Sequence, residues 1–157
     1  MFKIALVRPD EAAAVASMVK ALLEEIMAAT GSNHFKANEE ELRARCRDFL
    51  RQGHYTAWLA WAGNVAAGVL TLTEARALYA GGAFGVIPEF YVAPGYRSKG
   101  IGAALLAAAR EHGKARGWTR LEVTTPPLPE FDRALRFYQA NGFEVTGGKK
   151  LKTMLTS

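Results

Sequence analysis

The 157-residue sequence contains a single cysteine, Cys46, and only three histidines. One cysteine excludes an intramolecular disulfide and any CxxC metal site. The histidines, His34, His54 and His112, are far apart in the sequence and form no HxxxH or HExxH motif, so we expect no bound metal. Cys46 lies among arginines that could lower its thiol pKa, but a half-buried structural cysteine is the more frequent outcome.

Long hydrophobic runs are also missing. The longest, from Ile101 to Ala109, is too short to span a bilayer. Near the N-terminus, Arg8, Asp10 and Glu11 interrupt the apolar residues, so a signal-peptide core is absent. Half of the residues are hydrophobic and 22% are charged, as in ordinary globular domains. The length fits one domain over residues 1–157, which we expect to be cytoplasmic and to have no membrane partner.

The net charge of +5 permits anionic partners, but does not choose among them. Positive residues are scattered, and the densest run is Lys149-Lys150-Leu151-Lys152. Because no basic motif with stacked aromatic residues stands out, we do not expect nucleic acid as a partner. A basic nucleic-acid-binding module is kept as an alternative.

The spacing of apolar residues predicts an α+β fold with a mixed, mostly antiparallel sheet of about seven strands and about four flanking helices. Pro88 lies inside one apolar run and has no N–H for a ladder, so we expect that strand to be bulged or unpaired there. Strands are expected at 2–8, 55–62, 65–74, 85–92, 118–125, 143–145 and 151–155, and helices at 12–27, 38–51, 99–116 and 130–140.

Residues 97–102, Arg-Ser-Lys-Gly-Ile-Gly, lead from a predicted strand directly into a predicted helix. The first turn of a helix has N–H groups without internal partners and carries a partial positive charge. Gly100 and Gly102 lack Cβ atoms, and Arg97 and Lys99 add positive charge. This combination predicts a site for a pyrophosphate.

The segment resembles the acyl-CoA-binding motif of the GNAT superfamily of N-acetyltransferases, Arg/Gln-x-x-Gly-x-Gly/Ala, which Arg97-x-x-Gly100-x-Gly102 matches in full. Phe90-Tyr91-Val92-Ala93-Pro94 is similar to the family's fourth strand and its exit. Residues 136–143, Arg-Phe-Tyr-Gln-Ala-Asn-Gly-Phe, are similar to its late helix. The resemblance implies an α/β/α sandwich splayed between strands 4 and 5, with acetyl-CoA as cosubstrate.

In the family, the pantetheine arm of the cofactor fills the splay between these strands. The resemblance therefore implies backbone contacts from Phe90, Tyr91 and Val92, with the Val92 N–H stabilising the oxyanion. The diphosphate would lie against Arg97, Ser98, Lys99, Gly100, Ile101, Gly102 and Ala103. Asp132 stands where the family often has an Asn that contacts the pantetheine, and an ionised Asp cannot donate a hydrogen bond.

Two residues are candidates for proton transfer. Glu89 lies in an apolar run, and burial would raise the pKa of its carboxyl toward that of a useful base. In the family, a Glu at a comparable place on this strand often serves as the general base. Tyr138 occupies the position of the family's tyrosine, which donates a proton to the departing thiolate. The competing interpretations are a solvent-facing or lysine-paired carboxylate for Glu89 and a core aromatic for Tyr138.

The sequence thus predicts transfer of an acetyl group to a primary amine by direct attack in a ternary complex. A small-molecule amine is the first expectation, a protein or peptide amine the second, and a homodimer is frequent in the family. An acyl-CoA sensor without turnover is an alternative. A dinucleotide-dependent oxidoreductase is disfavoured because Leu105 replaces the third glycine of that fingerprint. Acceptor selection would fall to 29–38 (His34, Phe35), 75–84 (Arg76, Tyr79) and the segment around Lys149 and Lys150.

Overall fold

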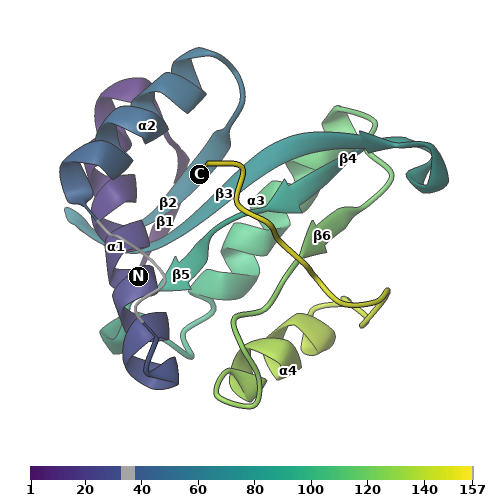
Figure 1. The fold of residues 1–157 in the computed structure, drawn as a ribbon. Helices are drawn as coiled ribbons and strands as arrows, with labels where there is room; N and C mark the ends of the chain where they lie inside the picture. Colours follow the sequence, from purple (N-terminus) through teal and green to yellow (C-terminus); the bar gives the residue numbers. More distant parts are fainter. Residues whose placement is uncertain (33–37, 157) are drawn as a thin grey trace.

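A computed structural model describes residues 1–32 and 38–156 and contains a six-stranded sheet with helices on both faces (Figure 1). Five strands pair in the order β1-β2-β3-β4-β6, and β5 pairs with β3. All pairs are antiparallel except β4 with β6. The strands are β1 (Lys3–Leu6), β2 (Thr56–Ala62), β3 (Val65–Ala77), β4 (Gly82–Ile87), β5 (Phe90–Val92) and β6 (Leu121–Val123).

Four helices were expected and four are present. The side chain of Asn38 accepts a hydrogen bond from the Glu41 N–H at 3.1 Å and thereby caps the second helix. Gly31, with φ of 69°, ends the first helix in the left-handed conformation. The helices are α1 (Ala12–Thr30), α2 (Glu39–Arg51), α3 (Ile101–Ala115) and α4 (Asp132–Ala140), and short 3₁₀ turns cover Pro9–Glu11, Leu78–Ala80 and Pro94–Tyr96.

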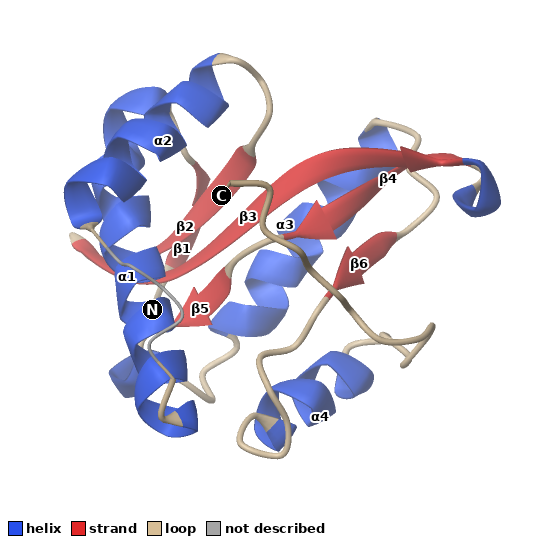
Figure 2. Cartoon of the chain, viewed as in Figure 1, coloured by secondary structure: helices blue, strands red, loops and turns tan. Residues whose placement is uncertain are grey.

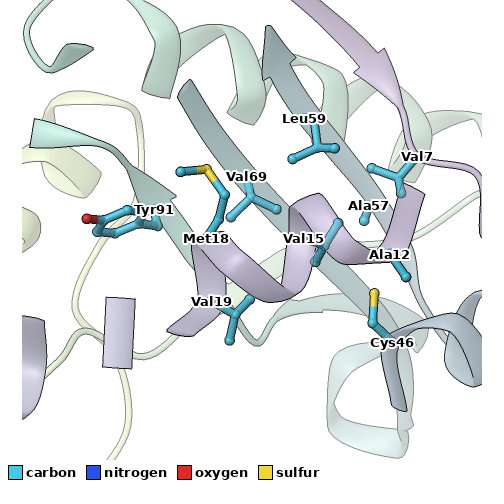
Figure 3. Packing of buried hydrophobic residues seen from close by; sticks show 10 residues of the cluster. All are labelled: Val7, Ala12, Val15, Met18, Val19, Cys46, Ala57, Leu59, Val69 and Tyr91. Atoms are coloured by element: carbon cyan, nitrogen blue, oxygen red, sulfur yellow. The ribbon is translucent and has the colours of Figure 1, made fainter. Parts of the chain in front are cut away.

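Each face of the sheet has its own apolar core. On one face, α1 and α2 pack over side chains such as Leu59, Val69 and Tyr91 (Figure 3). On the other face, α3 packs over Leu70 and Leu72. Phe137 of α4 joins this second cluster. Side chains alternate along β5, so Tyr91 belongs to the first face, while Phe90 and Val92 belong to the second.

The run expected as one strand over 85–92 is two strands, interrupted at Pro88 as the missing N–H predicts. Both strands pair with β3, where Thr73 is opposite Val86 and Leu70 is opposite Phe90. Two β3 residues therefore stand against three residues, 87–89, which is a β-bulge. Beyond Ile87, which pairs with Val123, the sheet opens, because β5 has no described partner other than β3.

The prediction of a final hairpin at 143–145 and 151–155 is wrong. Up to residue 156, no strand follows α4, and the sheet of the described residues has six strands instead of about seven (Figure 2). Residues 144–156 are all exposed, with Leu151 at 89% and Leu155 at 94%. Alternation of apolar residues does not make a strand without an edge to pair with, and β6 offers only three residues. The strand expected at 118–125 is shortened to β6, although the Thr119 N–H still donates to the Ala83 carbonyl at 3.2 Å.

No helix in the described ranges is both long and apolar enough to cross a membrane.

The contact between β4 and β6 depends on the absence of a side chain at Gly85. A Cβ there would lie 2.5 Å from Trp118 Cζ3 and 2.7 Å from Leu121 Cδ2. We expect Gly85→Ala to lower the free energy of unfolding by about 1–3 kcal/mol through overpacking, as measured by urea denaturation. Gly148→Ala is the control, because its Cβ would meet no atom within 4 Å. Equal midpoints for the two variants would contradict the packing described.

Candidate functional site

Six consecutive N–H groups, from Ser98 to Ala103, donate to no group within the described residues. The first helical hydrogen bond of this region runs from the Ala104 N–H to the Gly100 carbonyl at 3.0 Å. Unpaired main-chain donors at the start of a helix attract anions because the helix dipole is positive there. The segment predicted to hold a pyrophosphate therefore has the donors that such a group needs.

The conformation of this segment gathers these donors. Ser98 has φ of 62° and Gly100 has φ of 87°. Left-handed residues that alternate with right-handed ones turn successive N–H groups toward a common concavity that suits anions. Gly100 has open space around its missing Cβ, so its glycine is required by conformation rather than by crowding. The segment is exposed at residues 98–100, where a ligand can reach it.

Gly102 has a packing role in addition to the one that its motif suggests. A Cβ at this position would lie 2.8 Å from Cζ of Phe137 in α4. The glycine thus allows α4 to pack against the first turn of α3. Since Tyr138 follows Phe137, this contact also sets the position of the predicted acid relative to the anion site.

Arg97, predicted to add positive charge beside the anion site, is engaged elsewhere. Its Nε donates to the Val92 carbonyl at 2.7 Å, and a terminal nitrogen contacts Glu25 of α1 at 2.8 Å. Its guanidinium also lies 5.5 Å from the centre of the Tyr91 ring. The side chain ties β5 to α1, so the attraction for an anion comes mainly from the main chain and from exposed Lys99.

The open edge of β5 is formed by two residues, Phe90 and Val92. The Glu89 carbonyl and the Ala93 N–H are both bonded to β3, at 3.0 and 2.9 Å. Backbone groups alternate along a strand, so Tyr91 also faces β3, whereas Phe90 and Val92 face away from it. Of the three residues predicted to contact a pantetheine, Tyr91 therefore has no backbone group on the open edge. Arg97 already occupies the Val92 carbonyl, which leaves the Val92 N–H.

Glu89 lies in the bulge, half-buried and on the α1 and α2 face. Its carboxylate accepts hydrogen bonds from the Thr71 hydroxyl at 2.5 Å and the Tyr55 hydroxyl at 3.1 Å. The Glu89 N–H donates back to the Thr71 oxygen at 3.1 Å. Among the described residues no cation pairs with this carboxylate.

Burial raises the pKa of the Glu89 carboxyl, while the hydroxyls of Thr71 and Tyr55 act in the opposite direction. The raised pKa is the shift expected from the apolar sequence around it. Nearby, burial and the Glu89 carboxylate raise the pKa of the Cys46 thiol to about 11. The neighbouring arginines thus do not activate Cys46, which is a buried structural cysteine beside Ala12 and Val15 (Figure 3).

Tyr138 lies in an aromatic cluster with Phe90, Phe137 and Phe143, whose ring centres are 5.5–5.9 Å from its own. Burial raises the pKa of its phenol, so the hydroxyl stays protonated. That hydroxyl donates to no described residue, and it is not among the fully buried polar atoms. The ring of Tyr138 is therefore a core aromatic, and its hydroxyl has no partner among the described residues.

Asp132 is the first residue of α4, and its side chain makes no hydrogen bond or ion pair with a described residue. A carboxylate at this end of a helix is stabilised by the dipole, which gives it a structural reason to be there.

Of the residues predicted to select the acceptor, His34 and Phe35 lie outside the described residues. Tyr79 is exposed at the tip between β3 and β4, and Lys149 and Lys150 lie in the exposed C-terminal segment.

Three functional neighbours escaped the sequence analysis: Tyr55, Thr71 and Glu25. Thr71 offers a signal in retrospect, since a threonine inside the apolar run Val69–Leu72 needs a polar partner when buried. Its exposed fraction is 0%. Tyr55 and Glu25 carry no such signal. In the part of the chain that is described, no three His, Cys, Asp or Glu side chains come together as a metal site.

The hydrogen bond from Tyr55 gives a direct prediction. The Tyr55 hydroxyl stabilises the ionised form of Glu89, so Tyr55→Phe should raise the pKa of Glu89 further. Carboxyl carbon NMR of the glutamates against pH measures this. Tyr79→Phe removes an exposed phenol that has no contact with Glu89 and should leave the titration unchanged. A lower or unaltered pKa of Glu89 in Tyr55→Phe would contradict the assignment.

Comparisons with known proteins agree with this arrangement. The model of the acetyltransferase (GNAT) family matches residues 19–143. A curated relative, the uncharacterized N-acetyltransferase YsnE of Bacillus subtilis, is 28% identical over 105 residues, which cover 67% of this chain and 66% of that protein, just under two thirds of its length.

Two solved structures have a similar fold. Aminoglycoside N-acetyltransferase AAC(6')-Iy in complex with CoA superposes with a TM-score of 0.81 at 19% identity, covering 99% of this chain and 96% of that one. A predicted acetyltransferase from Clostridium acetobutylicum with acetyl-CoA has a TM-score of 0.79 at 18% identity, covering 99% and 97%. With a family model that spans both the open strand and the glycine motif, this chain belongs to the acetyltransferase (GNAT) family.

Proposed function

We propose that this chain transfers the acetyl group of acetyl-CoA to a primary amine by direct attack in a ternary complex. The observation that carries the proposal is the run of six unpaired N–H groups that begins six residues after the open edge of β5. One feature suits a diphosphate and the other suits an extended amide-bearing arm. Acetyl-CoA carries both and supplies an activated acyl group.

Residues 98–103 would hold the diphosphate through main-chain N–H groups, with Lys99, whose ammonium lies 5.9 Å from the centre of the Tyr96 ring, as a cation at the rim. The backbone groups of Phe90 and the N–H of Val92 would bind the pantetheine arm in the way a neighbouring strand would. The Val92 N–H would also stabilise negative charge on the acyl oxygen. A single donor of this kind is typically worth about 3–4 kcal/mol.

Glu89 would remove the proton that keeps an alkylamine unreactive. With a pKa near 10.4, such an amine is neutral in only about one molecule in 2,500 at pH 7. A half-buried carboxylate with a raised pKa and no cationic partner in the described part of the chain can accept that proton, directly or through a water molecule. Glu89 also lies in the bulge, next to the open edge where the acyl group would be bound.

Tyr138 would return a proton to the leaving sulfur. Its phenol stays protonated and its hydroxyl is not committed to another residue. No covalent acyl-enzyme is expected, because the single cysteine has a raised pKa and sits in the α2 core.

The acceptor is proposed to be a small-molecule amine, in line with the aminoglycoside acetyltransferase among the structural neighbours. The ribosomal-protein-alanine N-acetyltransferase from Brucella melitensis, also a neighbour, supports a protein amine as the second candidate. An acyl-CoA sensor would bind the cofactor without releasing thiol when amines are added. Thiol release on amine addition thus separates an enzyme from a sensor.

The anion site can be tested by binding alone. Gly100→Val places a branched side chain in the segment that would face the diphosphate, and we expect it to weaken acetyl-CoA binding at least about tenfold, or ~1.4 kcal/mol, in calorimetry. Gly147→Val is the matched control, since Gly147 also has positive φ and open space around it. If both variants bind acetyl-CoA like the parent, residues 98–103 are not the binding site.

The proposed base can be tested by its pH dependence. Glu89→Gln should lower kcat/KM about 10²–10⁴-fold near pH 7, because the amide cannot accept a proton. The deficit should narrow toward pH 10, where solvent deprotonates the amine, and acetyl-CoA affinity should stay near that of the parent. A rate ratio that is constant from pH 6 to pH 10 would remove Glu89 from the proton transfer.

A further inference from the structure

A pocket of about 130 Å³ lies between α1, α2 and the sheet, and Glu89 is part of its wall. Most of the remaining wall is apolar and belongs to the two helices. These apolar residues are Val15, Ala16, Val19, Leu42 and Phe49. The pocket therefore has a mostly apolar lining and a single carboxylate. Among the described residues, Glu89 is the only acidic side chain that lines it.

The carboxylate in this pocket lacks a counter-ion. Glu89 receives two hydroxyl hydrogen bonds, from Thr71 and Tyr55, and no ion pair from any residue that the structure describes. A partly buried anion without a cation is costly, and its pocket favours a ligand that brings a positive charge. An ammonium group meets this need and can donate the hydrogen bonds that the remaining carboxylate lone pairs accept.

The size of the pocket limits what is attached to that ammonium group. A cavity of about 150 Å³ holds one benzene molecule, so 130 Å³ holds about six non-hydrogen atoms. A nitrogen and five carbons fill it. A multi-ring aminoglycoside is far larger and could enter only with a thin aminoalkyl extension.

A second charge on the acceptor would meet Arg45, an exposed residue of α2 that also lines the pocket. Arg45 makes no ion pair with a described residue. Its guanidinium would repel a distal cation and attract a distal anion. The wall thus favours a single positive charge at the Glu89 end.

We propose that this pocket binds the acceptor of the reaction, a primary ammonium on an unbranched aliphatic stem of about five carbons with no second cation at its far end. The inference rests on the proposed function and adds the substrate class. Glu89 takes one proton from the bound ammonium, and the neutral amine attacks the thioester carbonyl, so that the new C–N bond replaces the C–S bond. The sulfur leaves with the proton of Tyr138, and the second proton that the nitrogen loses restores the Tyr138 hydroxyl through water.

The first experiment measures acetyl transfer to unbranched amines of increasing length, from propylamine to octylamine. Each buried methylene contributes about 0.8 kcal/mol, which corresponds to about a fourfold gain. We expect kcat/KM to rise up to about fourfold per carbon until pentylamine and then to level off, because the pocket is full. A flat series, or one that rises steadily to octylamine, would overturn the assignment.

The second experiment varies the far end of the five-carbon stem. Relative to pentylamine, 1,5-diaminopentane should have a KM about two- to fivefold higher, the scale of an exposed charge contact, and 5-aminopentanoate should have an equal or lower one. Arg45→Gln should abolish the penalty of the diamine. A parent enzyme that prefers the diamine, or a penalty unchanged in Arg45→Gln, would contradict the role of Arg45.

The same stem occurs in free amines and in the side chain of a lysine residue. Nα-acetyllysine methylamide and a peptide with one internal lysine are therefore assayed beside pentylamine. Acetylation of pentylamine alone identifies small molecules as the source, and preference for the peptide identifies protein lysines. Acetylation of α-amino groups only would overturn the proposal.

A binding measurement that needs no acetyl-CoA uses Cys46, the only cysteine, which lines the same pocket. Because this thiol is buried and its pKa is raised, its slow alkylation by iodoacetamide is followed over hours at about pH 9 by intact mass. Saturating pentylamine should slow the reaction at least about fivefold in the parent and not in Glu89→Gln. Leu42→Trp should fill the pocket and raise the KM for pentylamine, whereas Leu50→Trp, on the same helix but not in the pocket wall, is its control.

The experiments distinguish failure of the pocket assignment from failure of the proposed transferase activity. If amines are acetylated but show neither a length optimum nor protection of Cys46, the pocket is not the acceptor site and the transferase activity stands. If pentylamine protects Cys46 but no amine is acetylated, the proposed function fails and the pocket is an amine-binding site only.

Discussion

Pro88 has no N–H to donate to a neighbouring strand, and it stands where a single strand would otherwise run from Gly82 to Val92. The chain responds by placing three residues against two of β3 and resuming the ladder at Phe90. Two consequences follow from this bulge. The Glu89 carboxyl is directed into the α1 and α2 face, and β5 is left without a partner on its second edge. The candidate base and the candidate strand-like binding edge thus have one structural origin.

The sheet separates two sites of opposite charge preference. Unpaired N–H groups at the start of α3, on one face, attract an anion, while Glu89, on the other face, attracts a cation. If the two groups of charges shared one cavity, they would neutralise each other. Arg97 is paired with Glu25 at 2.8 Å, so its charge is largely neutralised within the protein. An anionic cosubstrate and a cationic acceptor can then be bound together.

What the sequence predicted correctly is mostly local. The donors of residues 98–103, the cap at Asn38 and the break at Pro88 each follow from neighbouring residues, whose conformations are fixed by φ preferences and missing N–H groups. What it missed is long-range. Thr71 and Tyr55 reach Glu89 across 18 and 34 residues, and Glu25 reaches Arg97 across 72. Such pairings depend on strand register and helix placement, which a single sequence does not specify.

The C-terminal hairpin, which is not formed, and the packing role of Gly102 both show that a local sequence pattern does not reveal contacts with distant elements. The alternation in 151–155 is a correct local pattern that has no edge to pair with. Gly102 fits a motif whose local explanation is close approach of a ligand, yet the atom that would collide with a Cβ belongs to Phe137. A motif therefore fixes which residue stands at a position, whereas the reason for it can lie in another element.

The absence of a counter-ion for Glu89 among the described residues is the feature that joins structure to chemistry. A lysine or arginine beside this carboxylate would lower its pKa and occupy the space between α1 and α2. Two hydroxyl donors instead satisfy part of its hydrogen-bonding capacity without neutralising its charge. Burial can then raise the pKa of the carboxyl, and the Glu89 side chain forms a charged part of the pocket wall. Because no described cation pairs with Glu89, its carboxyl keeps a raised pKa and can take a proton. For the same reason, the pocket favours an ammonium ligand, which carries that proton.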